Sequence, residues 1–470
     1  MNTDREGHTA GRGPGTLGDG SPAGDTVVVT AAETVNGLGI GWPAVREALA
    51  AGRDALGEAR DLAAAFRPGT VAAPCPPPDA RRYLGTPKLR KLMSDDAFLA
   101  TVAGKLAVAA AGLSRGPDRP IADDRFAAFV ACGIGAAGWR ELVPVFRDSM
   151  DDDGRLSLAR LGERGLRRCN PLFAFQVLAN MPLCFLSIEE SLRGDNLTFA
   201  PWEGGGADAI AEAAASLRRG DADAAVVCGA SAMAGTQGVY WLAEKGLLTP
   251  PQVRPRPLGI PASPAAGGAA GFHAPCLSGI GVHRCPSVVS FPDPPGDSPV
   301  AGLAPADGAA ALVLERFDNA RRRGARPLAA LAAFARETLA TDGFAPCRDS
   351  SVVARVARRA LERAAERHGT DSAPASVGAV ILSASGDPEG DRAEASGVAQ
   401  ALGGPFRAVV PASAWGNLFA AGPATAVAIA AHALAGDGPT DDGALAGAVL
   451  VVCAGPGGAV AAIVLEKVSS

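Results

Sequence analysis

The chain has 470 residues, which is enough for a large buried core and for two packed units of roughly 200 residues each. Hydrophobic residues make up 48% and charged residues 20%, a globular composition that excludes a disordered chain. The net charge of −5 argues against a nucleic-acid-binding surface, which needs a clustered positive field.

Membrane insertion and secretion are also not expected. No run approaches the ~18 apolar residues that a membrane span requires. Residues 1–25 lack the apolar segment of a signal peptide and are expected to be a disordered tail. The nine cysteines are scattered and odd in number, and Cys132, Cys228 and Cys453 lie in apolar strand-like runs, so we expect reduced thiols in a cytoplasmic protein.

The first half of the chain begins with a strand and then alternates helices and strands. The β-branched run 26–32 predicts a buried strand. A helix is expected over 44–52 with Gly52 as its C-cap, and a second, alanine-rich helix over 95–113. The run 125–138 predicts a strand that ends in a glycine-rich turn.

The segment 197–230 predicts a strand end, a glycine-rich turn, a helix and a buried strand. Its helix has one apolar face formed by Ile210, Ala213, Ala214 and Leu217, and Gly220 is expected to end it. Strands that alternate with helices imply a mainly parallel sheet with helices on both sides. The proline-rich stretch at about 248–305 interrupts this pattern and is interpreted as a long surface excursion.

Internal similarity indicates a duplicated α/β unit. The run 307–317 is similar to 457–468, and each follows a strand-plus-glycine segment. The run 127–138 is likewise similar to 379–390. Glycine- and alanine-rich strands can look alike by chance, but three pairs in matching order favour a duplication.

Three segments together resemble the β-ketoacyl synthases, which are condensing enzymes of the thiolase fold. They are "NPLFAFQVLANMPLCFLSIEESLRGDNLTF", "GGADAIAEAAASLRRGDADAAVVCGA" and "ADGAAALVLERFDNARRRGAR". The resemblance implies an α/β fold of duplicated βαβαβαββ halves in a layered α-β-α-β-α core. The expected halves are residues 26–318, which include the excursion, and residues 319–470.

The resemblance also implies where the family's reactive groups would stand. In the family a Cys takes the acyl chain from an acyl carrier protein, and two His and a Lys complete the site. Here the Cys position falls on Glu203, the two His positions on Ser383 and Asn417, and the Lys position on Ala412.

The gating phenylalanines of the family's last glycine loop fall on Ala454 and Pro456. None of the five His falls on a catalytic position. A carboxylate is a poor nucleophile towards a thioester because its attack would yield an unstable mixed anhydride. We therefore expect a structural or electrostatic role for Glu203.

No metal or cofactor is expected. Two His and two Cys within 272–285 match no strong zinc-binding pattern, so a solvated loop is expected there. The basic cluster 81–91 is interpreted as a solvated face, with recruitment of an acidic acyl carrier protein as the alternative.

The resemblance implies a non-condensing partner subunit, called the chain-length factor or ketosynthase β subunit. It would pair with a Cys-containing ketosynthase α subunit in type II polyketide biosynthesis, receive acyl carrier protein, and shape the acyl-chain tunnel. Four bulky residues are candidates for the tunnel lining, with ordinary core as the alternative: Trp139, Phe173, Phe175 and Met181. The alternative function is a divergent acyltransferase or malonyl decarboxylase with Glu203 as a base, and with Ser383 and Asn417 positioning the substrate.

Overall fold

A large mixed sheet forms the frame of the protein. The structure is a computed structural model that describes residues 26–59, 67–133, 139–248, 303–341, 344–368, 376–438, 445 and 447–468. Its main sheet comprises the strands β1 (Val27–Asn36), β2 (Gly39–Ile40), β5 (Phe126–Cys132), β6 (Asn196–Phe199), β7 (Ala224–Ala232), β8 (Asp307–Arg316), β9 (Ala329–Thr338), β10 (Val377–Ile381), β11 (Ala408–Val409), β12 (Ala448–Cys453) and β13 (Ala459–Glu466). A separate small sheet pairs β3 (Gly57–Glu58) with β4 (Val71–Ala72).

The sheet consists of two halves with the same strand order. One half runs β6-β5-β7-β8-β1 and the other β11-β10-β12-β13-β9, so the strands correspond one to one. In each half the first three strands are parallel and the last two are antiparallel to their neighbours. The halves meet where β1 pairs with β9 at Val28–Ala330 and Val29–Ala329. The duplication that the sequence predicted is therefore present in the fold.

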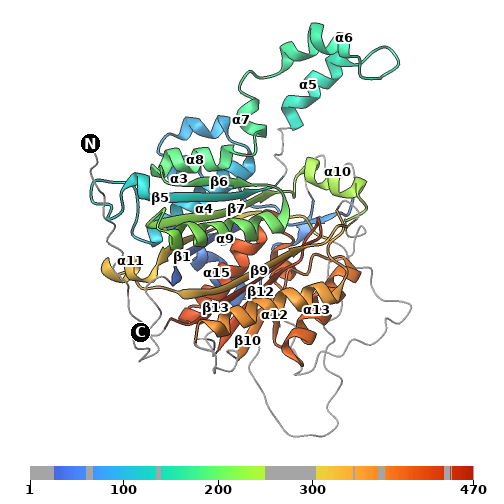
Figure 1. Ribbon diagram of the computed structural model, residues 1–470. Coiled ribbons are helices and arrows are strands. Elements are labelled where there is room, and N and C mark those ends of the chain that lie inside the picture. The colour runs from blue at the N-terminus through green and yellow to red at the C-terminus, as the bar shows by residue number, and fades with distance from the viewer. Residues whose placement is uncertain are drawn as a thin grey trace, which may run out of the picture.

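Helices cover the sheet on its outer faces and fill the space between its halves (Figure 1). The main helices are α1 (Trp42–Ala50), α4 (Asp95–Ala110), α8 (Met181–Glu190), α9 (Trp202–Arg219), α10 (Thr236–Glu244), α11 (Phe317–Arg322), α12 (Ser350–Glu366), α13 (Pro388–Leu402) and α15 (Gly422–Ala435). Helix α4 packs on the outer face of the first half and α12 on that of the second. Helices α9 and α15 contact strands of both halves. The layers thus follow the predicted α-β-α-β-α order.

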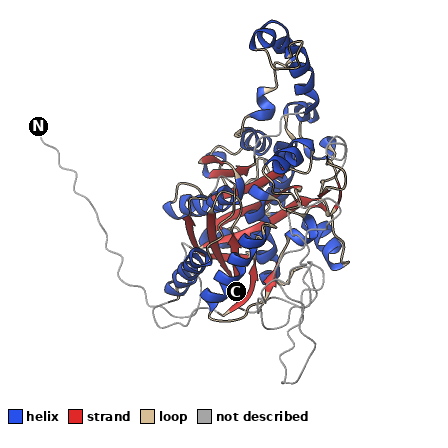
Figure 2. Cartoon of the chain, turned by 90° about the vertical axis from the view of Figure 1, so that its right-hand side faces the viewer, coloured by secondary structure: helices blue, strands red, loops and turns tan. Residues whose placement is uncertain are grey.

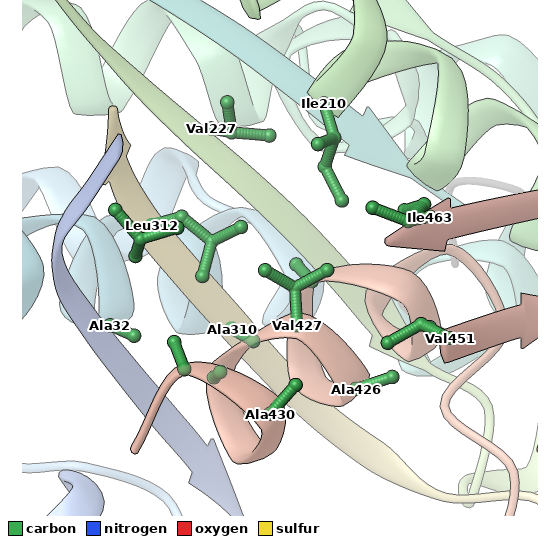
Figure 3. Close-up of a cluster of buried hydrophobic side chains, with 14 of the residues drawn as sticks. Ala32, Ile210, Val227, Ala310, Leu312, Ala426, Val427, Ala430, Val451 and Ile463 are labelled. Carbon is green, nitrogen blue, oxygen red and sulfur yellow. The ribbon is translucent and has the colours of Figure 1, made fainter. Parts of the chain in front are cut away.

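The middle layer contains the largest apolar cluster of the described residues. Figure 3 shows Val427 and Ala430 of α15 between Leu312 of β8 and Val451 of β12. Ile210 of α9 joins the same cluster. Two further clusters lie under α4 and under α12, on the outer faces of the two halves. Most of these buried side chains are Ala and Val, which lets the layers approach closely.

The predicted helix ends agree closely with the structure. Helix α1 is followed by Gly52, whose φ is +67°, and α9 ends at Gly220 with φ +78°. Only glycine adopts this left-handed conformation at little cost. Helix α4 begins as predicted, with the Ser94 side chain accepting a hydrogen bond from the Ala97 N–H, but it ends at Ala110. The predicted domain division after residue 318 lies within α11 and stays a prediction.

Residues 139–180, which we call the arm, stand away from the layers (Figures 1 and 2). The arm contains α5 (Trp139–Ser149), α6 (Leu158–Arg160) and α7 (Ala174–Val177). It leaves β5 and returns through α8 to the edge strand β6. Sequence patterns did not predict such a projection.

Several predictions concern residues outside the described ranges. These are the tail 1–25, the excursion between 249 and 302, and the His- and Cys-containing segment 272–285. Among the described residues, all the cysteines are free, and no helix combines the length and apolar character needed to cross a membrane.

The backbones of the two halves are in close contact at Gly229, and a glycine-to-alanine substitution tests this contact. A Cβ at Gly229 of β7 would lie 2.5 Å from the carbonyl oxygen of Ala420. We expect Gly229→Ala to lower the free energy of unfolding by about 1–3 kcal/mol, since backbone must shift to relieve the clash. Gly57→Ala is the matched control, because that exposed site is open and has no positive φ, and should change stability by less than about 0.5 kcal/mol. Equal urea midpoints for both variants would contradict this contact.

Candidate functional site

Glu203 lies in the first turn of α9, at the position that the resemblance assigned to the family's nucleophile. Its side chain is 3% exposed, and its Oε2 atom has no hydrogen-bond partner. The preceding residue, Trp202, has a φ of +72°, so the chain turns sharply as it enters the helix. The only described acid in the first turn of α9 is therefore buried at the helix N-terminus.

Asn417 comes from the other half of the chain and contacts Glu203. It lies between α14 (Ala412–Trp415) and the short 3₁₀ turn η5 (Phe419–Ala421). Its Oδ1 accepts a hydrogen bond of 2.8 Å from the Phe419 N–H. Its backbone N–H donates to the Ala304 carbonyl at 2.7 Å. These bonds fix the side-chain amide, which forms a hydrogen bond with the Glu203 carboxyl.

A small cavity of about 40 Å³ lies beside this pair. A cavity needs a volume of roughly 10–15 Å³ to hold one water molecule. The space therefore suits two or three waters and not an acyl chain. The structure brings together all four positions that the resemblance assigned to the lost reactive groups, since Glu203, Ser383, Ala412 and Asn417 line this cavity. Its other lining residues are Leu382, Pro411, Trp415, Gly416, Leu418, Gly422, Thr425, Ala426, Val452 and Cys453. Among the described residues, no Lys, Arg or His lines this cavity.

Ser383 follows β10, and hydrogen bonds occupy its hydroxyl. Its Oγ donates to the Val452 carbonyl at 3.2 Å and accepts from the Ala454 N–H at 3.0 Å. The backbone N–H groups of Ser383 and Ala384 both donate to the Glu394 carboxyl at 2.9 Å. This serine therefore holds the β12–β13 loop instead of presenting a free hydroxyl.

Three buried carboxyls lie close to one another in this region. Burial raises the pKa of Glu203 to about 7, although the hydrogen bonds from its own N–H and from Asn417 oppose the shift. Burial likewise raises the pKa of Glu394 to about 8 and that of Asp391 to about 7. Burial, together with the charges of Glu394 and Glu203, holds the pKa of the Cys453 thiol well above its usual value. An inert thiol follows, because the thiolate is the reactive form.

The glycine loop after β12 packs directly on Glu203. A Cβ at Gly455 would lie 2.0 Å from Oε2, so any larger residue there would displace this carboxyl. Ala454 and Pro456, the predicted gate positions, are buried but do not line the cavity. The loop thus covers Glu203 through its backbone.

The predicted tunnel-lining residues lie elsewhere. Phe173 and Phe175 belong to the arm, where Phe175 is 40% exposed. Met181 begins α8 and packs in the outer cluster with α4. The side chain of Trp139 is outside the described residues. None of the described three reaches the cavity, and their proposed role stays a prediction.

Sequence reasoning missed two features of the site. Trp415 and Cys453 line the cavity, but each lies in an ordinary apolar run that carries no functional signal. The three rings packed around Trp202 come from three separate segments, so no local pattern could reveal them.

Comparisons with known proteins agree with this geometry. A family model described as "Beta-ketoacyl synthase, N-terminal domain" matches residues 25–258, about half of the chain. The chain belongs to the β-ketoacyl synthase family. It is 28% identical over 332 residues to the tetracenomycin polyketide synthase ketoacyl synthase beta subunit of Streptomyces glaucescens, covering 70% of this chain and 66% of that protein.

A second relative is the 3-oxoacyl-[acyl-carrier-protein] synthase 2 of Vibrio harveyi, which is 32% identical over 243 residues. That match covers 52% of this chain and 49% of that protein. The chain therefore spans about half to two thirds of the length of these curated relatives.

Solved structures show the same fold. A β-ketoacyl synthase from Burkholderia phymatum STM815 superposes with a TM-score of 0.68 at 20% identity, covering 94% of this chain and all of that chain. The ishigamide ketosynthase/chain length factor gives the same TM-score and identity, with 94% and 99% coverage. The expected thiolase fold of the ketosynthases is confirmed.

The buried Glu203 carboxyl predicts a pH-dependent stability. Its folded pKa of about 7 exceeds the usual 4.5, so the folded state keeps a proton that the unfolded state loses between those values. Stability from this group is present below pH 4.5 and declines up to pH 7, by about 3 kcal/mol. Glu203→Gln removes this titration, so its free energy of unfolding should exceed that of the wild type at pH 8 but not at pH 4.5.

Urea unfolding at the two pH values measures this difference. Buried acids whose raised pKa does not depend on Glu203, such as Asp307, titrate in both proteins and cancel. Glu394 loses only the smallest part of its pKa shift, which comes from the Glu203 charge. Glu163→Gln, on the exposed arm, is the matched control and should leave the pH dependence unchanged. A Glu203→Gln protein with the wild-type pH profile would show that this carboxyl is ionised and compensated in the folded state.

Proposed function

We propose that this chain is a chain-length factor, a non-condensing ketosynthase β subunit of type II polyketide biosynthesis. One observation carries the proposal: the family scaffold surrounds a cavity in which a buried carboxyl stands at the nucleophile position. No described His or Lys lines that cavity. The similarity to the tetracenomycin beta subunit supports the same assignment.

The chemistry of the site disfavours acyl transfer on this chain. Condensation needs a nucleophile that forms a stable thioester and donors that stabilise the developing oxyanion. The Asn417 amide is engaged by Glu203, and the Ser383 hydroxyl is engaged by Val452 and Ala454. Burial raises the pKa of Glu203 to about 7, and attack of its carboxylate on a thioester would yield only a mixed anhydride. The role that remains is to shape a partner's active site.

The surface supports a protein partner. The arm exposes an apolar set, comprising Val143, Phe146, Met150, Leu156, Leu158, Leu166, Leu172, Phe175 and Leu178. Next to it, β6 is an edge strand whose Leu197 is 49% exposed. Exposed apolar surface and an open sheet edge are features that partner chains cover.

Relatives indicate the kind of partner. One similar structure is titled as a ketosynthase/chain length factor, and another as a type II polyketide synthase acyl-carrier protein in complex with its ketosynthase. By analogy, the proposed partners are a Cys-containing ketosynthase α subunit and an acyl carrier protein, and the proposed place of action is the cytoplasm. Phe173 and Phe175 on the arm would then face the interface and contribute to the tunnel.

Co-expression with the α subunit tests the proposal. We expect the two chains to co-purify in a one-to-one complex that elongates a polyketide, whereas this chain alone transfers no acyl group. Leu158→Asp together with Leu166→Asp on the arm should weaken co-purification, because charges would be buried in the interface. Asp152→Asn, on the same arm, is the control for surface changes. An active homodimer of this chain would refute the assignment.

A second function is malonyl decarboxylation with Glu203 as a base. The observation that favours it is the raised pKa of about 7 together with an Oε2 atom that has no partner beside the cavity. Glu203→Gln separates the two functions. The chain-length-factor reading expects the complex with the α subunit to keep its product distribution and rate in this variant. Carbon dioxide release from malonyl-acyl carrier protein by the isolated chain, lost in Glu203→Gln, would favour the decarboxylase.

A further inference from the structure

Trp202 is a strained residue directly before Glu203. Its φ of +72° is a conformation that bulky side chains rarely adopt, yet the side chain is only 6% exposed. Phe419, two residues after Asn417, has a φ of +45°. Strain of this kind persists only where surrounding packing imposes it. Two of the four described non-glycine residues with positive φ thus flank the Glu203–Asn417 pair.

These two strained residues belong to one aromatic cluster, which we call the ring cluster: Trp202, Trp241, Phe344 and Phe419. The Trp202 ring centroid lies 5.0 Å from Trp241, 5.4 Å from Phe419 and 5.9 Å from Phe344. Trp241 and Phe344 are 4.6 Å apart and nearly perpendicular. The four residues come from α9, α10, the segment after β9, and η5. Rings at these distances form a filled volume.

The ring cluster and the cavity both lie near residue 203 but are formed by different residues. No member of the ring cluster lines the cavity. Trp202 packs beneath the same loop that covers Glu203, since a Cβ at Gly457 would lie 3.7 Å from Trp202 Cδ1. The cluster continues to the exposed Lys245, whose Nζ lies 5.2 Å from the Phe344 ring centroid. The described surroundings of the first turn of α9 thus include a small cavity on Glu203 and closely packed rings on Trp202.

We propose that Trp202 is the residue that denies position 203 room for an acyl chain. The ring cluster occupies the volume that a chain attached at 203 would need, and the cavity admits only a group of a few heavy atoms. This inference rests on the proposed function, in which position 203 corresponds to a lost nucleophile. It adds that restoring a thiol there does not restore a chain-binding site while Trp202 remains.

A reporter thiol tests the proposal in the full-length chain. Glu203→Cys is treated with methyl and with octyl methanethiosulfonate, and mass spectrometry of the peptide that contains residue 203 gives each rate of disulfide formation. Because a packed interior resists added methylenes, we expect octyl labelling to be at least about tenfold slower than methyl labelling. In Glu203→Cys/Trp202→Gly the octyl rate should rise at least about tenfold, with the methyl rate much less changed.

Controls separate loss of the ring from general loosening. Trp42→Ala removes another buried tryptophan, one that stacks on His432 at 4.3 Å and is not part of the ring cluster, and should not raise octyl labelling. If Trp202→Gly does not fold, Trp241→Ala opens the ring cluster from α10 and should give the same selective increase. Octyl labelling of Glu203→Cys as fast as methyl labelling, or an equal effect of Trp42→Ala, would overturn the proposal. The assay needs no partner, so its failure is distinct from failure to co-purify with a ketosynthase.

Discussion

The structure depends on a backbone contact in the middle layer, where the two halves of the chain touch without side chains between them. A Cβ on Gly206 of α9 or on Gly229 of β7 would lie 2.5 Å from the Ala420 carbonyl oxygen. Glycine at both positions lets α9, β7 and the turn before α15 approach closely. The first turn of α9 therefore lies against the segment that carries Asn417, and a site formed from both halves results.

The close approach of these segments buries Glu203, and this burial is the main influence on the pKa of its carboxyl. A helix N-terminus favours a negative charge by about 0.3–1 kcal/mol, which alone would lower the pKa of Glu203. Burial instead raises the pKa from 4.5 to about 7, which corresponds to about 3 kcal/mol in the opposite direction, so burial outweighs the helix dipole. The Glu203 charge also contributes to the raised pKa of the buried Glu394, so the two acids disfavour each other's ionised form.

Sequence patterns predicted those structural features that depend on residues close together in the chain. The buried strand at 26–32, the apolar face of α9 and its end at Gly220 follow from side-chain periodicity and from the conformational freedom of glycine. The positions of Glu203, Ser383, Ala412 and Asn417 around one cavity could be anticipated only through the family resemblance. Features that arise from contacts between segments far apart in the chain left no recognisable pattern in the sequence. The ring cluster, the saturated Ser383 hydroxyl and the projecting arm all belong to this second group.

The side chains around Glu203 are coupled to one another through packing, so one substitution at position 203 would change several contacts at once. Any residue larger than glycine at 455 would displace the Glu203 carboxyl. Ser383 uses its hydroxyl to hold the loop that carries this glycine. The strained Trp202 and Phe419 fill the remaining space between these segments. The described residues that line the cavity include no histidine, so a thiol at position 203 would have no imidazole beside it. Chemistry at this position therefore depends on several contacts at once and not on one side chain alone.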